Sequence, residues 1–514
     1  AVHGHNNLQN ATIFPHNSGL GAANDPALLK DIGAVTAREV RATGLDWTFA
    51  PTLAVARDDK WGRAYESYSE RPEIVAAYSK AMVEGLQGSQ NSQDFLIGDQ
   101  VMATAKHFIG DGGTQMGIDK GDTIGNVEEL LELHGAGYQP AIDSGVQTVM
   151  ASFSSINGEK MHGSKRLLTD VLRGEMGFDG FVVGDWNGHA EVPGCTATDC
   201  PASLEAGVDM YMAPDSWKEL YASLLAQAKS GELSAEALDQ AVLRILKVKI
   251  RSGLFEAGLP STRASTDLDA LGTPENTAIA RRAVRQSLVL LKNENAVLPL
   301  NPAQTILVAG SGADSMQQQT GGWTLNWQGD GNDNSIFETG ETIFSGIDAQ
   351  LKKHGGEAVL SLDGSFTSKP DAAIVVFGEQ PYAEYRGDRS DLVFEFENGE
   401  NLALLKKLQD QNIPVVTVFL TGRPLWVNPH INASDAFIVG WLPGTEGGGI
   451  ADVIIGDKDG NARHDVSGRL SFSWPADGTG KPINTDSDSG IRFPYGYGLS
   501  YSDNGGLDDL PEKP

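Results

Sequence analysis

The first half of the chain alternates short apolar runs with longer amphipathic stretches. Apolar runs of four or five residues indicate buried strands, and apolar positions spaced three and four residues apart indicate helices. The predicted strands are 46–50, 101–105, 148–152, 181–184 and 210–213. The predicted helices are 26–43, 72–88, 127–143, 165–174, 216–230 and 234–253. Over about 250 residues, this alternation with short connections favours a (β/α)8-type barrel of parallel strands.

The alternation stops at residues 257–275, which hold two prolines and little apolar periodicity, and then restarts. The second set of predicted strands is 306–309, 358–362, 372–377, 415–420 and 436–440, with helices at 276–292, 341–354, 400–412 and 446–456. We therefore expect an α/β protein in four parts. These are a barrel at 1–256, a linker at 257–275, a smaller open α/β sandwich at 276–456 and an irregular tail at 457–514 packed on the second domain.

The net charge of the chain argues against some classes of binding partner. The 514 residues include 68 acidic and 39 basic side chains, for a formal charge of −29. Such a chain repels phosphate, which argues against nucleic acid and anionic membranes as partners. No apolar run approaches the ~18 residues that span a bilayer, so no membrane insertion is expected. The start of the sequence does not resemble a signal peptide, so we expect a mature, trimmed or cytosolic chain.

Cysteine occurs twice, as Cys195 and Cys200 with four residues between them. A zinc site needs more ligands than this pair supplies, and we expect no metal and no cofactor. Two interpretations stay open, a pair of buried thiols and a short loop disulfide. The disulfide is favoured, and it would imply an oxidising compartment, either periplasmic or extracellular.

Three stretches place reactive side chains at predicted strand ends, the active edge of a parallel barrel or open sheet. GFVVGDW ends in Asp185 and Trp186, and the carboxylate there is either a catalytic group or the cap of the next helix. AKHFIGDGGT carries Lys106 and His107, which either donate hydrogen bonds to hydroxyl groups or are a solvated lysine and a packed histidine. VVFGEQPYAEYRGDRSD places Glu379 after a strand of the second half, in what could equally be a solvated loop.

Taken together, these stretches resemble glycoside hydrolase family 3, in particular its two-domain β-glucan exohydrolases. The resemblance extends along nearly the whole chain, through AVHGHN, ATIFPHN, RDDKWGRAYESYSE and VVGDW in the first half. It continues through SLVLLKNENAVLPL, GGWTLNWQGD, TGRPLW, GWLPGTEGGG and FPYGYGLSY in the second. The resemblance implies that a barrel-opening segment precedes AVHGHN in relatives, so we expect the first strand and its glucose-binding aspartate to be missing from this sequence. Two explanations stay open, a trimmed sequence and an incomplete barrel.

The resemblance also implies a role for each matching position. Asp185 corresponds to the nucleophile and Glu379 to the acid/base carried by the second domain, and the two carboxyl groups are expected to converge on one pyranose. A retaining glycosidase needs such a pair about 5–5.5 Å apart. The positions implied to bind substrate are Arg63, Lys106, His107, Met150, Trp186 and Trp323.

The implied activity is that of a retaining, exo-acting β-glucosidase or β-glucan exohydrolase. Two facing indoles, Trp186 and Trp323, would select a sugar by stacking, so both β-1,3 and β-1,4 glucans and oligosaccharides are the expected substrates. A β-xylosidase and a catalytically inactive carbohydrate-binding homologue stay as alternatives. A family 3 N-acetylglucosaminidase is disfavoured, because Ile109 and Asp111 replace the proline and histidine of its usual motif.

Overall fold

The computed structural model describes residues 2–263, 265–396 and 398–514. Its chain divides into two compact units that do not follow one another along the sequence. The first unit holds Leu29–Ala56 and Pro72–Ala270, together with Val2. The second holds His3–Leu28, Arg57–Arg71 and Leu271–Pro514. Two early segments therefore pack with the second half of the chain, which no single boundary in the sequence can express, and the predicted boundaries stay a prediction.

Parallel strands form the centre of the first unit. The sheet has the order β1 (Thr104–Phe108), β3 (Thr148–Ala151), β6 (Phe181–Val183). Parallel bridges extend it at both sides, from Trp47 to Met102 and from Val183 to Met210. The predicted strands at 46–50 and 210–213 are thus reduced to single bridges, and the first strand of the sheet proper begins three residues later than predicted.

Helices alternate with these strands, as in a TIM-barrel-like fold. They are α2 (Pro26–Ala42), α3 (Pro72–Gln87), α4 (Val127–His134), α5 (Tyr138–Asp143), α6 (Pro201–Ala206), α7 (Trp217–Ser230) and α8 (Ala235–Arg251). A π-helix covers Arg166–Glu175. Ser234 caps α8 as predicted, because its side chain accepts the backbone N–H of Ala237. The predicted helix at 127–143 is two helices, which the glycines at 135 and 137 separate.

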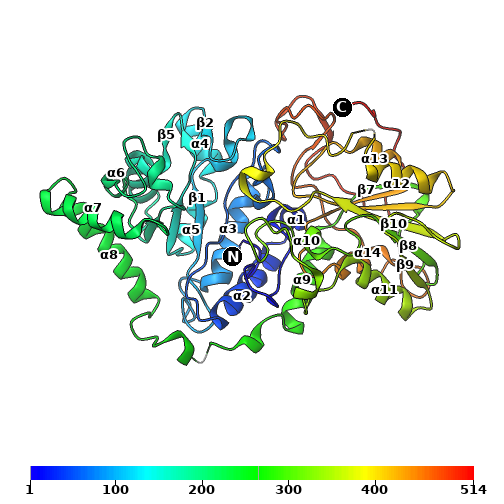
Figure 1. The fold of residues 1–514 in the computed structure, drawn as a ribbon, viewed down its shortest axis with the longest axis horizontal. Helices are drawn as coiled ribbons and strands as arrows, with labels where there is room; N and C mark the ends of the chain where they lie inside the picture. Colours follow the sequence, from blue (N-terminus) through cyan, green and yellow to red (C-terminus); the bar gives the residue numbers. More distant parts are fainter. Residues whose placement is uncertain (1, 264, 397) are drawn as a thin grey trace. The chain divides into compact units, whose positions relative to one another are not determined.

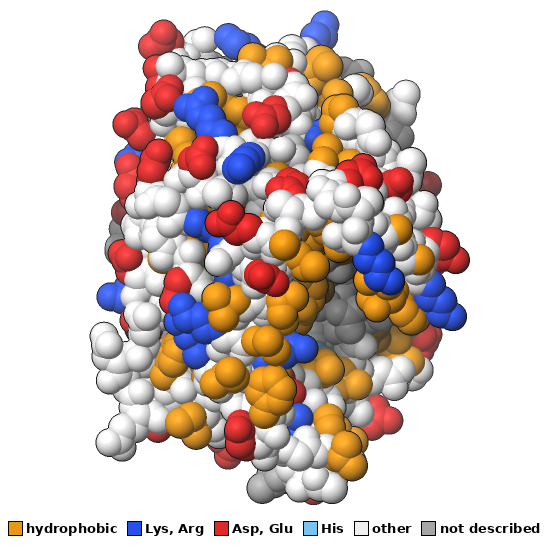
Figure 2. All heavy atoms as spheres, turned by 90° about the vertical axis from the view of Figure 1, so that its left-hand side faces the viewer, with side chains coloured by type: hydrophobic (Ala, Val, Ile, Leu, Met, Phe, Trp, Pro, Cys, Tyr) orange, Lys and Arg blue, Asp and Glu red, His pale blue; other side chains and the backbone are white. Residues whose placement is uncertain are grey.

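Helices α7 and α8 expose an apolar surface on the first unit. Figure 2 shows hydrophobic side chains gathered on the side that carries these helices. Trp217, Tyr221 and Ile250 are each more than half exposed. An open groove beside α7 is lined by Tyr211, Met212, Ala213, Pro214, Trp217, Leu220, Tyr221 and Leu224.

The second unit is built on a six-stranded sheet in the order β7-β12-β11-β10-β8-β9. The strands are β7 (Val289–Asn293), β8 (Thr305–Ala309), β9 (Glu357–Leu360), β10 (Ala372–Gly378), β11 (Val415–Leu420) and β12 (Ala436–Trp441). All pairs are parallel except that of β7 with β12. The prediction of one helix over 276–292 is wrong at its end, because α9 (Pro274–Ser287) stops and β7 follows.

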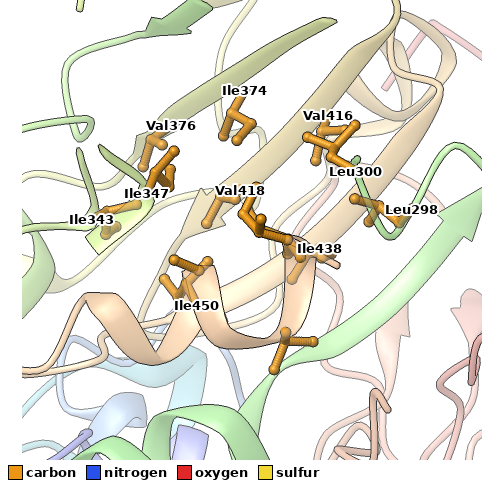
Figure 3. Close-up of a cluster of buried hydrophobic side chains, with 14 of the residues drawn as sticks. Leu298, Leu300, Ile343, Ile347, Ile374, Val376, Val416, Val418, Ile438 and Ile450 are labelled. Carbon is orange, nitrogen blue, oxygen red and sulfur yellow. The ribbon is translucent and has the colours of Figure 1, made fainter. Parts of the chain in front are cut away.

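Helices cover both faces of this sheet (Figure 1). On one face α9, α11 (Ile343–Lys353) and α14 (Gly448–Ile454) bury a core of branched aliphatic side chains with the strands. Ile347, Val376, Val418, Ile438 and Ile450 belong to this core (Figure 3). On the other face lie α12 (Glu400–Gln409) and α13 (Asn428–Asn432). Burial on both faces explains the nearly continuous apolar strands of this domain.

Short elements complete the two units. In the second unit these are α1 (Asn17–Ala23), α10 (Met316–Thr320) and the pair β13 (Trp474–Pro475) and β14 (Ile491–Phe493) within the tail. In the first unit, β2 (Asp122–Thr123), β4 (Ser155–Ile156) and β5 (Glu159–Lys160) form a small separate sheet. Within the described residues, no helix is long and apolar enough to cross a membrane.

Candidate active site

The carboxyl ends of β1, β3 and β6 meet at one edge of the first unit, because the three strands are parallel neighbours. Lys106 and His107 lie near the carboxyl end of β1, and Asp185 follows β6 by two residues. The imidazole Nε2 of His107 lies 3.8 Å from Oδ2 of Asp185. The fold thus brings together side chains that are about 80 residues apart in the sequence.

His107 is held between two carboxylates. Its Nδ1 is 2.9 Å from Oδ2 of Asp111, and the residue is 3% exposed. This contact turns Nε2 toward Asp185, as the outer partner of a histidine commonly does. Asp111 is a residue that sequence reasoning did not assign to the site, although it lies in the glycine-rich loop directly after the predicted histidine.

The carboxylate of Asp185 does not cap a helix. Its Oδ1 accepts the backbone N–H of Trp186 at 2.7 Å, and its side chain is 15% exposed. The 3-10 turn Gly188–Glu191 that follows has no side-chain cap. The backbone N–H of Asp185 donates to Nε2 of His162 at 2.9 Å. The catalytic interpretation of Asp185 stays a prediction.

The neighbouring predicted residues differ in their exposure. Trp186 is 57% exposed, so its indole is available to a sugar ring. Lys106 is 6% exposed within β1. Met150 is 2% exposed and packs in a hydrophobic cluster with Phe181 and Val183, beneath the strand ends. A contact of Met150 with substrate stays a prediction.

A disulfide joins Cys195 and Cys200 in the loop that follows Trp186, with their Cα atoms 4.7 Å apart. Cys200 is fully buried, immediately before α6. The disulfide closes a small loop in the stretch that connects the end of β6 to the next helix.

In the second unit, Glu379 follows β10 directly and is 7% exposed. The residue before it must be glycine, because a Cβ on Gly378 would lie 1.7 Å from the carbonyl oxygen of Leu420. This close approach lets the backbone N–H of Glu379 donate to that same carbonyl at 2.9 Å. The strand end and its carboxylate are thereby fixed on β11.

The carboxylate of Glu379 is surrounded by hydrogen-bond donors. Oε2 accepts from the Tyr382 hydroxyl at 3.0 Å, the Thr421 hydroxyl at 2.9 Å and the backbone N–H of Gly422 at 3.0 Å. Oε1 accepts from Nε of Arg423 at 3.2 Å. The motif TGRPLW contains three of these donors, but its sequence alone does not show that they converge on Glu379.

Arg63 and Trp323 share one carboxylate in the second unit, that of Glu66. Arg63 binds Glu66 with two hydrogen bonds, of 2.7 and 3.0 Å, and the indole N–H of Trp323 donates to it at 3.1 Å. Glu66 is fully buried. The guanidinium of Arg63 also lies 5.9 Å from the centre of the Trp323 ring, within cation–π range. Glu66 thus fixes two predicted substrate contacts, and sequence reasoning missed it.

Two tyrosines connect the donors around Glu379 with the group formed by Arg63, Glu66 and Trp323, all within the second unit. The Tyr65 hydroxyl donates to the carbonyl of Tyr382 at 3.0 Å, and the two rings meet edge to face at 5.5 Å. Glu384 lies 3.9 Å from Arg63.

Among the residues that the structure describes, no three His, Cys, Asp or Glu side chains gather in a way that could hold a metal ion.

Comparison with family models matches both halves of the chain. The glycosyl hydrolase family 3 N-terminal domain matches residues 1–248, and the C-terminal domain of the same family matches residues 288–501. Lysosomal beta glucosidase of Dictyostelium discoideum is 32% identical over 98% of this chain and 64% of its own length. A beta-xylosidase of Formosa agariphila is 31% identical over 96% of this chain and 72% of its own length.

Among solved structures, the fold is very similar to exo-1,3/1,4-beta-glucanase from a Pseudoalteromonas species. The TM-score is 0.98 at 51% identity, over 100% of this chain and 64% of that chain. The chain thus spans just under two thirds of that enzyme and of the Dictyostelium relative. The expected barrel-plus-sandwich architecture is confirmed by this similarity.

Proposed function

The chain belongs to glycosyl hydrolase family 3, and from that premise we propose that it is a retaining, exo-acting β-glucosidase. Its substrates would be β-1,3 and β-1,4 glucans and their oligosaccharides, from which it releases glucose at the non-reducing end. The observation that carries the proposal is the grouping of His107, Asp185 and the exposed Trp186 at one edge of parallel strands.

In the first step, a carboxylate oxygen of Asp185 attacks the anomeric carbon as the bond to the leaving oxygen breaks. Glu379 gives its proton to that oxygen, and a covalent glucosyl-enzyme remains. In the second step, Glu379 takes a proton from water, which attacks the same carbon and releases Asp185. Two inversions leave the β configuration unchanged.

The residues around each carboxylate fit these roles. A nucleophile must be ionised and held still, and Asp185 is held by the N–H of Trp186 and approached by His107. His107 and Lys106 are donors that can bind sugar hydroxyls at the same strand edge. The donors around Glu379 fix the direction in which its carboxylate points.

A β-xylosidase is the second candidate, because a relative of that name is 31% identical over nearly the whole chain. Xylose differs from glucose by one hydroxymethyl group, which a single apolar or polar contact can decide. A catalytically inactive binding protein is disfavoured by the presence of Asp185 and Glu379 in ordered, hydrogen-bonded environments.

The disulfide supports a periplasmic or extracellular location for the protein, because disulfides persist in oxidising compartments. The proposed chemistry uses two carboxyl groups and water, so it calls for no cofactor. Neutral glucans suit a chain whose charge is −29.

The test is hydrolysis of laminaribiose, cellobiose and xylobiose, with the first anomer released followed by NMR. We expect β-glucose from the two glucosides and little release of xylose. Asp185→Ala should lower turnover by at least about 10⁴-fold. Asp179→Ala, which removes an exposed carboxylate paired with Arg251, should keep wild-type turnover. Initial release of α-glucose, or full activity of Asp185→Ala, would refute the proposal.

Glu379→Ala tests the acid/base role separately. The variant should lose most activity on disaccharides and keep most of the first step on aryl glucosides whose leaving groups need no proton. Added azide, a nucleophile that needs no general base, should then attack the glucosyl-enzyme, release Asp185 and give β-glucosyl azide. Equal losses for good and poor leaving groups, without azide rescue, would assign Glu379 a different role.

A further inference from the structure

A buried histidine that the proposed mechanism does not use touches the backbone of the proposed nucleophile. His162 lies in the 3-10 turn Met161–Gly163 and is 2% exposed. Its Nε2 lies 2.9 Å from the backbone nitrogen of Asp185, which carries the hydrogen. His162 therefore accepts this hydrogen bond with a ring lone pair.

Accepting with Nε2 requires the neutral ring with its proton on Nδ1. The other side of the ring hydrogen-bonds the backbone of Ser152, the residue directly after β3. Burial, together with the nearby His189, lowers the pKa of His162 from 6.5 to about 3. The ring thus stays neutral and keeps its lone pair at any pH at which a β-glucosidase would be assayed.

The loop after Asp185 is shaped around this ring. A Cβ on Gly188 would lie 2.4 Å from Cε1 and 2.5 Å from Nε2 of His162. The N–H of Gly188 also donates to the carbonyl of Asp185 at 2.9 Å. Glycine at 188 therefore lets the ring reach the strand end while the loop folds back over it.

We propose that His162 is a positioning residue, whose imidazole bridges the ends of β3 and β6 and thereby aims the carboxylate of Asp185 at the anomeric carbon. This inference rests on the proposed function, since it assumes that Asp185 is the nucleophile. A displacement of about 1 Å at a reacting atom can cost about 10²-fold in rate. The loss should fall on the attack by Asp185 and not on binding of the sugar.

The test measures covalent labelling of Asp185 by 2,4-dinitrophenyl 2-deoxy-2-fluoro-β-glucoside, with the labelled residue identified by mass spectrometry. His162→Leu removes both hydrogen bonds at similar volume, and we expect labelling to slow about 10²-fold. The inhibition constant of glucose should change less than about threefold, because ground-state binding is kept.

Four variants separate positioning from simple destabilisation. His162→Gln can place an amide oxygen near the Nε2 position, and it should recover at least about tenfold of the lost rate. His162→Asn is too short to do so and should behave like the leucine variant. Gly188→Ala displaces an unaltered His162 ring and should also slow labelling. His430→Leu, a buried histidine substituted in the second unit, should lower the melting temperature and leave the labelling rate unchanged.

Each outcome decides between the two proposals. Labelling of His162→Leu at the wild-type rate, or equal losses in the glutamine and asparagine variants, would overturn the positioning role while Asp185 stays the nucleophile. Failure of the wild-type protein to be labelled at Asp185 would overturn the proposed function and this inference with it. If the leucine variant does not fold, the glutamine–asparagine comparison decides.

Discussion

The guanidinium of Arg423 donates from Nε to Oε1 of Glu379 at 3.2 Å, and both side chains are buried. The same guanidinium donates to the backbone carbonyls of Asp59, Lys60 and Gly387. Burial opposes the positive charge, but Tyr382 and Glu379 more than offset this, so the pKa of Arg423 lies above its ordinary value. The Arg423 guanidinium thus binds the carboxyl group of Glu379 and two backbone segments at the same time.

Arg423→Met should unfold the protein more readily and disable it. Removing one partner of such a buried pair costs about 3–5 kcal/mol, because the carboxyl group of Glu379 and the backbone carbonyls lose their hydrogen-bond donor. We expect a drop of this size in the free energy of unfolding, measured in urea. Arg386→Met, at an exposed pair with Asp330, should change it by less than about 1 kcal/mol. Similar small changes in both variants would contradict the assigned role.

Trp186→Ala should affect the second sugar and spare the first. Its indole is 57% exposed beside Asp185, which suits stacking on the sugar that becomes the leaving group. We expect kcat/KM for laminaribiose and cellobiose to fall about tenfold, and kcat/KM for β-glucosyl fluoride, whose leaving group cannot stack, to stay within about twofold. Trp217→Ala removes an equally exposed indole on α7 and should change neither.

Loss of the Cys195–Cys200 disulfide should lower stability. Closing a loop of this length stabilises a protein by about 2 kcal/mol through the unfolded chain. The Cys195→Ser/Cys200→Ser double variant should therefore unfold at lower urea concentration than the oxidised protein, by an amount equivalent to that free energy. Treatment with a reductant should shift the wild type in the same direction once thiol titration finds two thiols. If the urea midpoint of unfolding is unchanged once two thiols are found, the prediction is wrong.

Acid should destabilise the second unit through its buried histidines. His3 and His16 stack with ring centres 3.7 Å apart, and burial lowers the pKa of His16 from 6.5 to about 4. The unfolded chain then binds more protons than the folded one between these values. Stability from His16 is complete above pH 6.5 and falls toward pH 4, by up to about 1.4 kcal/mol per pH unit. The free energy of unfolding of His16→Gln should fall less steeply over that window. Parallel profiles of the variant and the wild type would contradict the assignment.

Sequence pattern predicted β8, β10, β11 and β12 well, because these strands are buried on both faces and stand between turn residues. It failed at Val289–Asn293, where the apolar run SLVLLKN continues directly from a helix. Periodicity cannot separate a buried strand from a buried helix over so short a run. Pairing of β7 with β12, about 150 residues later, decides the outcome.

The same distinction applies to the candidate site, where local sequence singles out some residues and gives no sign of others. Asp185 and Glu379 could be singled out because each follows an apolar strand, and the family resemblance implied their roles, which stay predictions. Glu66 could not, since its partner Trp323 is 257 residues away and nothing local distinguishes it from other acidic residues. His162 was missed for a similar reason, because its contact is with a backbone N–H and leaves no trace in the pattern of side chains.

The interleaving of the two units has a consequence for biosynthesis. Residues 3–28 and 57–71 leave the ribosome well before Val289, yet they belong to a unit whose sheet strands begin at that residue. Helix α1 packs against α9, which is translated some 250 residues later. These segments stay unburied until the intervening chain has been translated. Nascent protein therefore exposes these two segments to proteases and chaperones. Cutting the gene at the linker would leave the second unit without residues 3–28 and 57–71, whereas the first unit would keep its core segments.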